Sequence, residues 1–237
     1  MRPRCHKILK PHARIRPYVE QAGLLRPTEI TSFQTDSRLI CALLERWRPE
    51  THTFILPTGE CTITLEDIHM ILGLKVDGLP VTSDRHISWN DFENLLGSNI
   101  DQSSRVRKTV KLTWLRTYME QLEGDQSPET LVYHFRAYCL YFIGSVLFPD
   151  KTGNLVHIKW LAMLEKEPIE IETYIWGSTC LAWLYRGMCD GAYNGVHDIM
   201  GCTILIQAWA YSRITCIAPR PRTNIPDRFP LFNRYVK

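Results

Sequence analysis

The sequence predicts a mainly α protein, a compact multi-helix domain of about eight helices with one small β-hairpin near residues 53–64. Apolar residues recur at helical spacing in several segments, whereas only one pair of short strand-like runs flanks a turn. Helix-start and helix-stop residues bracket most of the helical segments. The composition, 45% hydrophobic and 22% charged, is that of an ordinary globular chain, and its 237 residues suffice to bury a substantial core.

The first strong helical pattern lies in the segment "DSRLICALLERWRP". Its apolar residues from Leu39 to Trp47 fall on one stripe at helical spacing. Asp36 is a favoured N-cap residue, and Pro49 stops the helix because proline cannot continue it. The runs "HTFIL" and "CTITL" then flank the turn "PTGE", which predicts the β-hairpin.

The hairpin and the residues after it are rich in the side chains that build metal and acid–base sites. These side chains are His52, Glu60, Cys61, Glu66, Asp67 and His69. Local structure accounts for most of them, because Thr64 and Asp67 match a helix capping box. Ile63 and Ile68 supply its hydrophobic staple, and Gly73 ends the short helix. We therefore predict no catalytic residue and no metal ligand in this stretch.

The same start and stop signals recur downstream. Ser88 and Asp91 form a second capping box, with Ile87 and Phe92 as its staple and Gly97 as its stop. The pattern predicts a second short helix between these signals.

Four further helices are expected in the second half of the chain. The first opens at Ser127-Pro128, with proline at the first helical position, and runs through "ETLVYHFRAYCLYFIGSVLF". After the turn "PDKTGN", the apolar segments "LVHIKWLAMLE", "ETYIWGSTCLAWLYRGMC" and "GCTILIQAWAYSRI" are each interpreted as a helix. The last two are expected to be buried on most sides because few of their positions are charged.

Two basic, proline-punctuated ends bracket an acidic body. Residues 1–26 carry a net charge of +6 and residues 213–237 carry +5, whereas residues 27–212 carry −8. Such ends can hold phosphate backbones, although solvated tails or tails docked on the acidic body explain the same pattern. Any DNA binding is expected to be weak, insensitive to sequence and confined to the ends, because the body repels the duplex. The residues expected to contact DNA are Arg2, Arg4, Lys7, Lys10, Arg14, Arg16, Arg220 and Arg222.

The chain is expected to be a soluble intracellular protein that does not enter a membrane. Its start, "MRPRCHKILKPHARIRP", lacks the apolar region of a secretory signal. Its longest uncharged runs, of 13 to 14 residues, are shorter than the about 20 residues that span a bilayer. No Cys-x-x-Cys pair occurs, and Cys189, His197 and Cys202 lack a fourth zinc ligand. We therefore expect free thiols and no bound metal.

Four longer segments carry a family resemblance. They are "LICALLERWRPETHTFILPTGECTITLEDIHMILGLKVDGLPV", "RAYCLYFIGSVLFPDKTGNLVHIKWL", "YIWGSTCLAWLYRGMC" and "GCTILIQAWAYSRI". In this order they resemble the signature of the plant mobile domain family, also labelled aminotransferase-like, and they extend over residues 23–217. This family includes maintenance-of-meristems proteins, long-form homologues of serine/threonine-protein phosphatase 7, and copies carried by plant transposable elements.

The resemblance implies a non-enzymatic nuclear interaction module that acts in meristem maintenance, genome stability and silencing of transposons and genes. It also implies a phosphatase-like nuclear protein as partner. The expected organisation is a basic N-terminal segment (1–23), a plant mobile domain-like helical domain (24–217) and a basic, proline-rich C-terminal segment (218–237).

The sequence departs from the family pattern in two ways. Met200-Gly201 stands where members often have Gly-Gly, and the family domain usually continues beyond the segment matched by Pro230-Leu231. We therefore expect a copy that is shortened at its C-terminal end or derived from a transposon.

The label aminotransferase-like is not matched by the residues that pyridoxal-phosphate chemistry needs. Lys75 and Lys159 are the lysines next to strongly apolar segments, and neither is followed by a glycine-rich phosphate cradle. No nucleophile elbow and no His-Glu-x-x-His motif occurs. We therefore predict a non-enzyme without cofactor or small-molecule substrate. Two alternatives remain: a transposon-derived nucleic-acid-binding domain that uses its basic ends, and an enzyme of unrecognised type.

Overall fold

The structure is a computed structural model, which describes residues 5–6, 8–30, 33–124, 126–194 and 199–220. Within these ranges the protein is mainly α-helical, which confirms the predicted class. The α-helices are α1 (Arg16–Gln21), α2 (Leu25–Thr28), α3 (Ser37–Leu44), α4 (Leu65–Leu72), α5 (Trp89–Leu96), α6 (Leu112–Met119), α7 (Pro128–Phe142), α8 (Leu161–Leu164), α9 (Pro168–Ile171), α10 (Trp176–Asn194) and α11 (Thr203–Arg213). A π-helical turn, Ile143–Leu147, continues α7.

The strands are short and form small antiparallel sheets. They are β1 (Cys5–His6), β2 (Phe33–Gln34), β3 (Trp47–Arg48), β4 (Thr53–Leu56), β5 (Gly59–Cys61), β6 (Arg105–Val106), β7 (Thr109–Lys111) and β8 (Leu155–His157). β1 pairs with β2, and the other strands form two three-stranded sheets in the orders β3-β4-β5 and β6-β7-β8. The predicted hairpin is β4–β5, and the second three-stranded sheet adds to the single hairpin that the sequence predicts.

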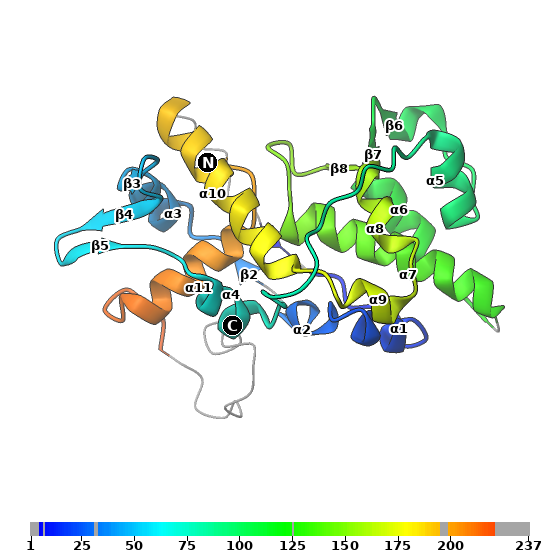
Figure 1. Ribbon diagram of the computed structural model, residues 1–237, viewed down its shortest axis with the longest axis horizontal. Coiled ribbons are helices and arrows are strands. Elements are labelled where there is room, and N and C mark those ends of the chain that lie inside the picture. Colours follow the sequence, from blue (N-terminus) through cyan, green and yellow to red (C-terminus); the bar gives the residue numbers. More distant parts are fainter. Residues whose placement is uncertain (1–4, 7, 31–32, 125, 195–198, 221–237) are drawn as a thin grey trace.

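The molecule is elongated, with a group of elements at each end (Figure 1). At one end, α5, α6 and α8 pack on α7, and β8 packs on the π-helical turn. At the other end, α11 contacts α3 and α4, and α10 contacts α3, α4 and β3. Helices α1, α2 and α9 lie along the lower edge in this view, where α1 contacts α7 and α9.

The predicted helix starts are present in the structure. Asp36 accepts hydrogen bonds from the backbone N–H groups of Arg38 and Leu39, each 3.0 Å long, and so caps α3. Both capping boxes form, from Thr64 to Asp67 at α4 and from Ser88 to Asp91 at α5. These local signals therefore set where the short helices begin.

The helix predicted to extend toward Pro49 instead ends at Leu44. Trp47 lies in β3, where it pairs with Phe54 across the sheet. Its ring contacts those of Phe54 and Tyr185, with centroids 4.9 and 5.2 Å apart. Tertiary packing of the large ring thus outweighs the helical spacing of the sequence.

The segment "LVHIKWLAMLE", interpreted from its sequence as one helix, begins as a strand. Residues Leu155–His157 pair with Thr109–Lys111 as β8 and β7, and α-helical structure begins only at Leu161. A short apolar run cannot be assigned to helix or strand by periodicity alone, which explains the difference.

Helix α11 is a central element of the core. Every residue from Thr203 to Ala210 is buried, including the amide side chain of Gln207. Gln207 Oε1 accepts the backbone N–H of Asp36 at 2.8 Å, so α11 is bonded to the N-cap of α3. A buried amide must find partners, and this bond fixes how the two helices are placed relative to each other.

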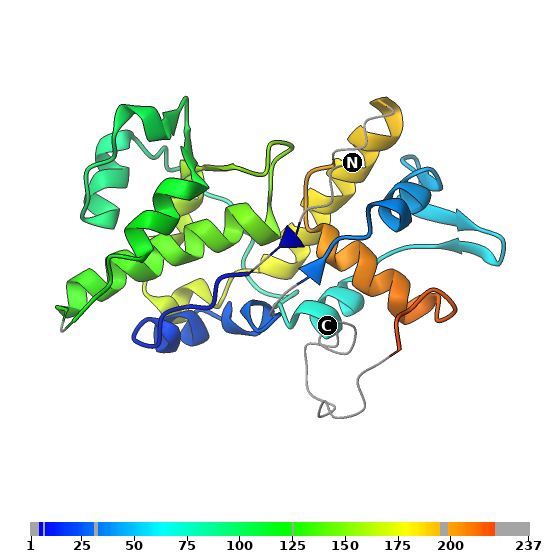
Figure 2. The same cartoon turned by 180° about the vertical axis from the view of Figure 1, so that it is seen from behind.

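The chain before α1 and α1 itself are also part of the core. Ile8, Ile15 and Val19 are at most 5% exposed. Tyr138 on α7 donates its hydroxyl to the carbonyl oxygen of Leu9 at 2.8 Å. Figure 2 shows this chain running along α7 before it enters α1. The basic N-terminal segment therefore contributes apolar side chains to the fold.

Thr64→Ala tests the capping box. We expect the substitution to lower the free energy of unfolding by about 1 kcal/mol, because the backbone N–H of Asp67 loses its acceptor. Thr58→Ala, at an exposed turn position between β4 and β5, is the matched control and should be nearly neutral. Urea denaturation of both variants measures the difference, and equal losses would contradict the assigned role of Thr64.

A buried histidine lies in an aromatic stack between α6 and α7. The ring of His134 stacks on that of Tyr118 with centroids 4.6 Å apart, and the ring of Tyr118 stacks on that of Trp114 with centroids 5.5 Å apart. Among the described residues, Nδ1 of His134 has no hydrogen-bond partner. Burial, and secondarily the charge of His12, lower the pKa of His134.

This lowered pKa makes stability depend on pH. Below about pH 6.5 the unfolded chain binds a proton at His134 that the folded protein does not, so stability falls as pH decreases toward the folded-state pKa. His134→Phe keeps the stack and should reduce the loss between pH 7.5 and 5.5 by up to about 1.4 kcal/mol. His86→Phe, at an exposed histidine, is the matched control. A pH dependence of unfolding that His134→Phe leaves unchanged would rule this role out.

Candidate interaction cleft

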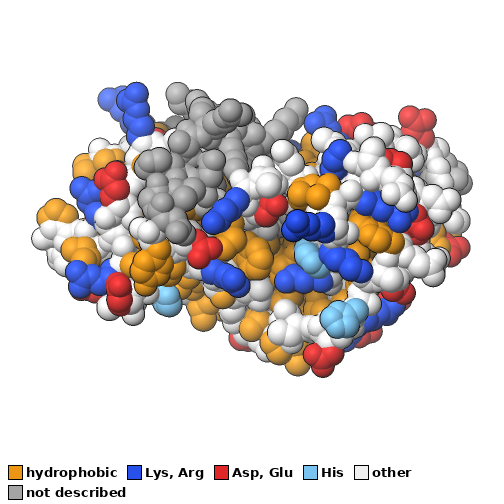
Figure 3. Space-filling view, turned by 90° about the horizontal axis from the view of Figure 1, so that it is seen from above, with side chains coloured by type: hydrophobic (Ala, Val, Ile, Leu, Met, Phe, Trp, Pro, Cys, Tyr) orange, Lys and Arg blue, Asp and Glu red, His pale blue; other side chains and the backbone are white. Residues whose placement is uncertain are grey.

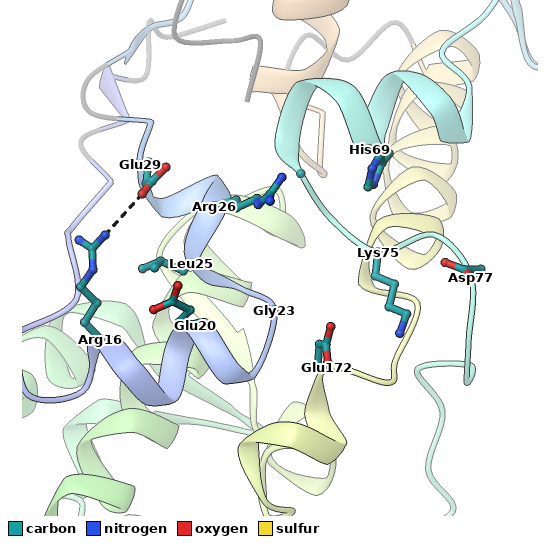
Figure 4. A pocket seen from close by; sticks show the side chains of 11 residues that line it. Arg16, Glu20, Gly23, Leu25, Arg26, Glu29, His69, Lys75, Asp77 and Glu172 are labelled. Atoms are coloured by element: carbon teal, nitrogen blue, oxygen red, sulfur yellow. Dashed lines mark ion pairs between the residues drawn. The ribbon is translucent and has the colours of Figure 1, made fainter. Parts of the chain in front are cut away.

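An open cleft of about 870 Å³ lies among α1, α2, the C-terminal end of α4 and the residue after α9. Figure 4 shows charged side chains reaching into it from opposite sides. Its lining residues are Arg16, Glu20, Gly23, Leu25, Arg26, Glu29, His69, Gly73, Lys75, Asp77 and Glu172. They come from separate segments of the chain, so the cleft exists only in the folded protein.

Two glycines let the walls of the cleft approach closely. Gly73 ends α4 at φ 71°, and a Cβ there would lie 2.9 Å from Cδ and 3.0 Å from Cβ of Arg26. Gly23 follows α1 at φ 69°, and a Cβ there would lie 2.9 Å from Cγ of Glu172. Both positions combine a left-handed backbone with a tight contact, so only glycine fits without strain.

The far wall is held by backbone hydrogen bonds between two distant segments. The carbonyl of Lys75 accepts the N–H of Gly177 at 2.8 Å, and Leu79 donates to the carbonyl of Thr173 at 2.9 Å. A Cβ on Gly78 would lie only 2.3 Å from that same carbonyl oxygen, so the two segments are in direct contact. This pairing fixes the backbone that carries Lys75 and Asp77 at the rim.

The cleft carries both signs of charge. Three basic and four acidic side chains line it, and Arg16 and Glu29 form an ion pair of 3.5 Å. Both partners are about half exposed, so this pair adds little stability. In the described parts of the chain, the other five charged residues form no ion pair: Glu20, Arg26, Lys75, Asp77 and Glu172. These five side chains remain able to pair with a protein surface that presents complementary charges.

The structure separates the basic residues predicted to contact DNA. Lys10, Arg14 and Arg16 lie before and at the start of α1, and Arg220 follows α11; all four are exposed. α1 and the C-terminal end of α11 lie far apart along the long axis (Figure 1). The remaining members of the set, Arg2, Arg4, Lys7 and Arg222, lie outside the described residues.

The histidines and carboxylates around the hairpin do not converge. The ring of His52 lies 5.2 Å from that of Tyr185, whereas Nδ1 of His69 lies 3.1 Å from the carbonyl oxygen of Leu74. Glu60 accepts a hydrogen bond from the hydroxyl of Thr53. Across the described residues, no three or more His, Cys, Asp and Glu side chains form a group that could hold a metal ion.

The cysteines of the incomplete zinc pattern have other neighbours. Cys189 Sγ accepts a hydrogen bond from Trp47 Nε1 at 3.3 Å. Cys202 is fully buried beside Cys180, whose thiol pKa is raised by this contact and by burial. His197 lies outside the described residues.

Sequence reasoning missed one ion pair that positions the cleft. Arg213, at the end of α11, donates to Oδ1 of Asp67 at 2.7 Å, while Oδ2 of Asp67 completes the capping box of α4. The two residues are 146 positions apart, so no local pattern connects them. The convergence of the charged cleft residues was missed for the same reason, because they lie in separate segments of the chain.

Comparisons with known proteins agree with the resemblance seen in the sequence. The family model described as Plant mobile domain matches residues 23–237. An Arabidopsis thaliana protein named serine/threonine-protein phosphatase 7 long form homolog is 40% identical over 193 residues, which are 81% of this chain and 14% of that protein.

Two further Arabidopsis thaliana relatives match most of the chain. Protein MAIN-LIKE 2 is 37% identical over 90% of this chain and 32% of its own length. Protein MAINTENANCE OF MERISTEMS is 33% identical over 90% of this chain and 44% of its own length. The chain therefore spans less than half the length of these curated relatives. No solved structure shows significant similarity to it. None of the described helices has the length and apolar character needed to cross a membrane.

Gly73→Ala tests the contact between α4 and α2. Gly124 has a similar φ of 67°, but a Cβ there would meet nothing within 4 Å, so Gly124→Ala is the matched control. The control should cost about 1 kcal/mol through backbone strain alone. Gly73→Ala should cost at least about 1 kcal/mol more, because Arg26 must move. Denaturant unfolding measures both variants, and equal losses would show that this wall of the cleft is loosely packed.

Proposed function

Because this chain belongs to the plant mobile domain family, we propose that it is a non-enzymatic interaction module of the nucleus. Its role would be meristem maintenance, genome stability and silencing of transposons and genes. The observation that carries this proposal is the match along 90% of the chain to proteins named MAINTENANCE OF MERISTEMS and MAIN-LIKE 2. The shared region is 90% of this chain and 32% and 44% of those two relatives, so the role is proposed for the domain that they have in common.

We infer that the partner is a phosphatase-like nuclear protein and that it binds at the cleft. The Arabidopsis thaliana protein named serine/threonine-protein phosphatase 7 long form homolog carries a region 40% identical to this chain, and its name supports the inference of a phosphatase-like partner. The cleft supports binding of a protein because basic and acidic side chains that form no ion pair with other described residues surround one opening. A surface of mixed charge selects a partner by charge complementarity and disfavours a uniformly charged polymer.

The surroundings of two lysines support the non-enzymatic assignment. Lys75 lies in the cleft beside Asp77 and Glu172, and no glycine-rich phosphate cradle follows it in the sequence. Lys159 Nζ lies over the ring of Trp160, 4.6 Å from its centroid, so an aromatic face occupies one side of the amine.

Reversing the basic charges of the cleft tests the proposal. The double variant Arg26→Glu/Lys75→Glu should bind the purified Arabidopsis phosphatase 7 long form homolog at least about tenfold more weakly than the wild-type chain does. Arg38→Glu/Arg48→Glu makes the same charge change at exposed positions on α3 and β3 and should leave the Kd within about twofold. Unfolding curves establish that both variants fold, and calorimetry gives the Kd.

Two outcomes would contradict the proposal of this partner and this surface. Absence of binding by the wild-type chain would remove the partner, and equal binding by both double variants would remove the cleft as the binding surface. Failure of the wild-type chain to accumulate in plant nuclei would contradict the nuclear role.

A further inference from the structure

A second charged surface lies on the opposite side of the molecule from the cleft, where β6–β8 approach α10. Seen from above, this side shows Lys, Arg and His side chains gathered beside hydrophobic ones (Figure 3). The described residues that form it, here called the hairpin–α10 surface, are Arg107, Lys108, His157, Lys159 and Arg186. All five are exposed.

Strand pairing holds three of these residues together. Val106 pairs with Thr109, so Arg107 and Lys108 are the two turn residues at the tip of the β6–β7 hairpin. Thr109 pairs with His157, and the carbonyl of Lys108 accepts the N–H of Ile158 at 3.0 Å. The hairpin tip therefore lies against the end of β8.

Two tryptophans hold Lys159 in place next to α10. Its Nζ lies 4.6 Å from the ring centroid of Trp160 and 5.7 Å from that of Trp183. Trp183 precedes Arg186 by three residues on α10, so the two side chains lie on the same face of that helix. The indoles thus position an ammonium group beside a guanidinium group, in a geometry that cation–π attraction stabilises.

Within the described residues, no ion pair neutralises the positive charges of this surface. In the described ranges, none of the five residues forms an ion pair with a carboxylate. Burial, and then Lys159 and Lys108, lower the pKa of His157, whose Nδ1 accepts the N–H of Lys159. Burial, and then Arg186, lower the pKa of Lys159. The like charges are close enough to repel one another, so an anion bound among them would relieve that repulsion.

The backbone at the hairpin tip has a strained conformation at Arg107. Arg107 has φ 56°, in the left-handed region that glycine and asparagine favour at hairpin turns. An arginine at this position costs backbone strain but presents a cation at the outermost point of the hairpin.

We propose that the hairpin–α10 surface binds the phosphate backbone of nucleic acid. Lysine and arginine side chains spread over a strand end, a hairpin tip and a helix face can contact successive phosphates. The face of Trp160 next to Lys159 is occupied by that ammonium group, so stacking of bases there is disfavoured and binding is insensitive to sequence. This site belongs to the helical body and is separate from the basic ends of the chain.

Neutralising the surface in the full chain tests the proposal. The triple variant Lys108→Gln/Lys159→Gln/Arg186→Gln is compared with Lys10→Gln/Arg14→Gln/Arg220→Gln, which removes three positive charges from the ends. The probes are a fluorescently labelled single strand of about 20 nucleotides and the corresponding duplex, titrated at about 50 and about 200 mM KCl. Binding is followed by fluorescence anisotropy.

We expect the surface triple variant to bind at least about tenfold more weakly than wild type at low salt, and the end variant to bind less than about threefold more weakly. The slope of log K against log salt should decrease by about 0.7 to 0.9 for each phosphate that the variant no longer neutralises. Lys159→Arg keeps the charge and should bind as wild type does. If the triple variant fails to fold, Lys108→Gln at the exposed hairpin tip replaces it, with an expected weakening of about threefold.

Three outcomes would overturn the proposal. The first is absence of wild-type binding at low salt, and the second is weakened binding in the end variant alone. The third is equal binding to phosphatidylserine vesicles with the same sensitivity to the triple variant, which would assign the surface to anionic lipid.

Discussion

The carboxylate of Asp67 is the constraint on which much of this structure depends. It is only 6% exposed, and a buried charge must be hydrogen-bonded and paired to be tolerated. One oxygen accepts the backbone N–H and hydroxyl of Thr64 at 2.8 and 2.9 Å, and the other accepts from Arg213 at 2.7 Å. A single side chain thus sets the start of α4 and attaches the end of α11 to it. Because α4 ends at Gly73 in the wall of the cleft, the hydrogen bonds and ion pair of Asp67 help to position that wall.

The sequence predicts those parts of the fold that depend on neighbouring residues. The N-cap of α3 and both capping boxes are predicted correctly because each signal lies within a few residues. The place of Trp47 in β3 and the strand at Leu155–His157 depend on packing against distant segments, so spacing predicts helix at both. The cleft depends on contacts between distant segments. The sequence shows glycines at positions 23 and 73, but it does not show that Gly73 packs against Arg26 or that Gly23 packs against Glu172.

The distribution of charge over the surface also depends on contacts between distant segments. The body is acidic as a whole, yet several of its carboxylates form ion pairs with arginines of the body. These pairs are Arg85–Glu165, Arg105–Glu93 and Arg116–Glu120. The hairpin–α10 surface keeps its positive charges unpaired within the described residues, so the net charge of a segment does not give the potential at one face. In Figure 1 the cleft helices α1 and α2 follow the lower edge and β7 and β8 lie near the upper one, so a protein and a nucleic acid would meet different faces.

The burial of the chain from Ile8 through α1 affects how the domain folds as a cooperative unit. The family match starts at residue 23, but Ile8, Ile15 and Val19 are buried. The ring centroid of Tyr18 lies 6.0 Å from that of Phe135 on α7. A chain that starts at residue 23 would leave one side of α7 as an apolar groove open to water. Such a groove favours self-association, because exposed apolar area is removed from water when two copies meet. We therefore expect the smallest independently folding unit to be larger than the region of family similarity and to include the N-terminal residues that cover this side of α7.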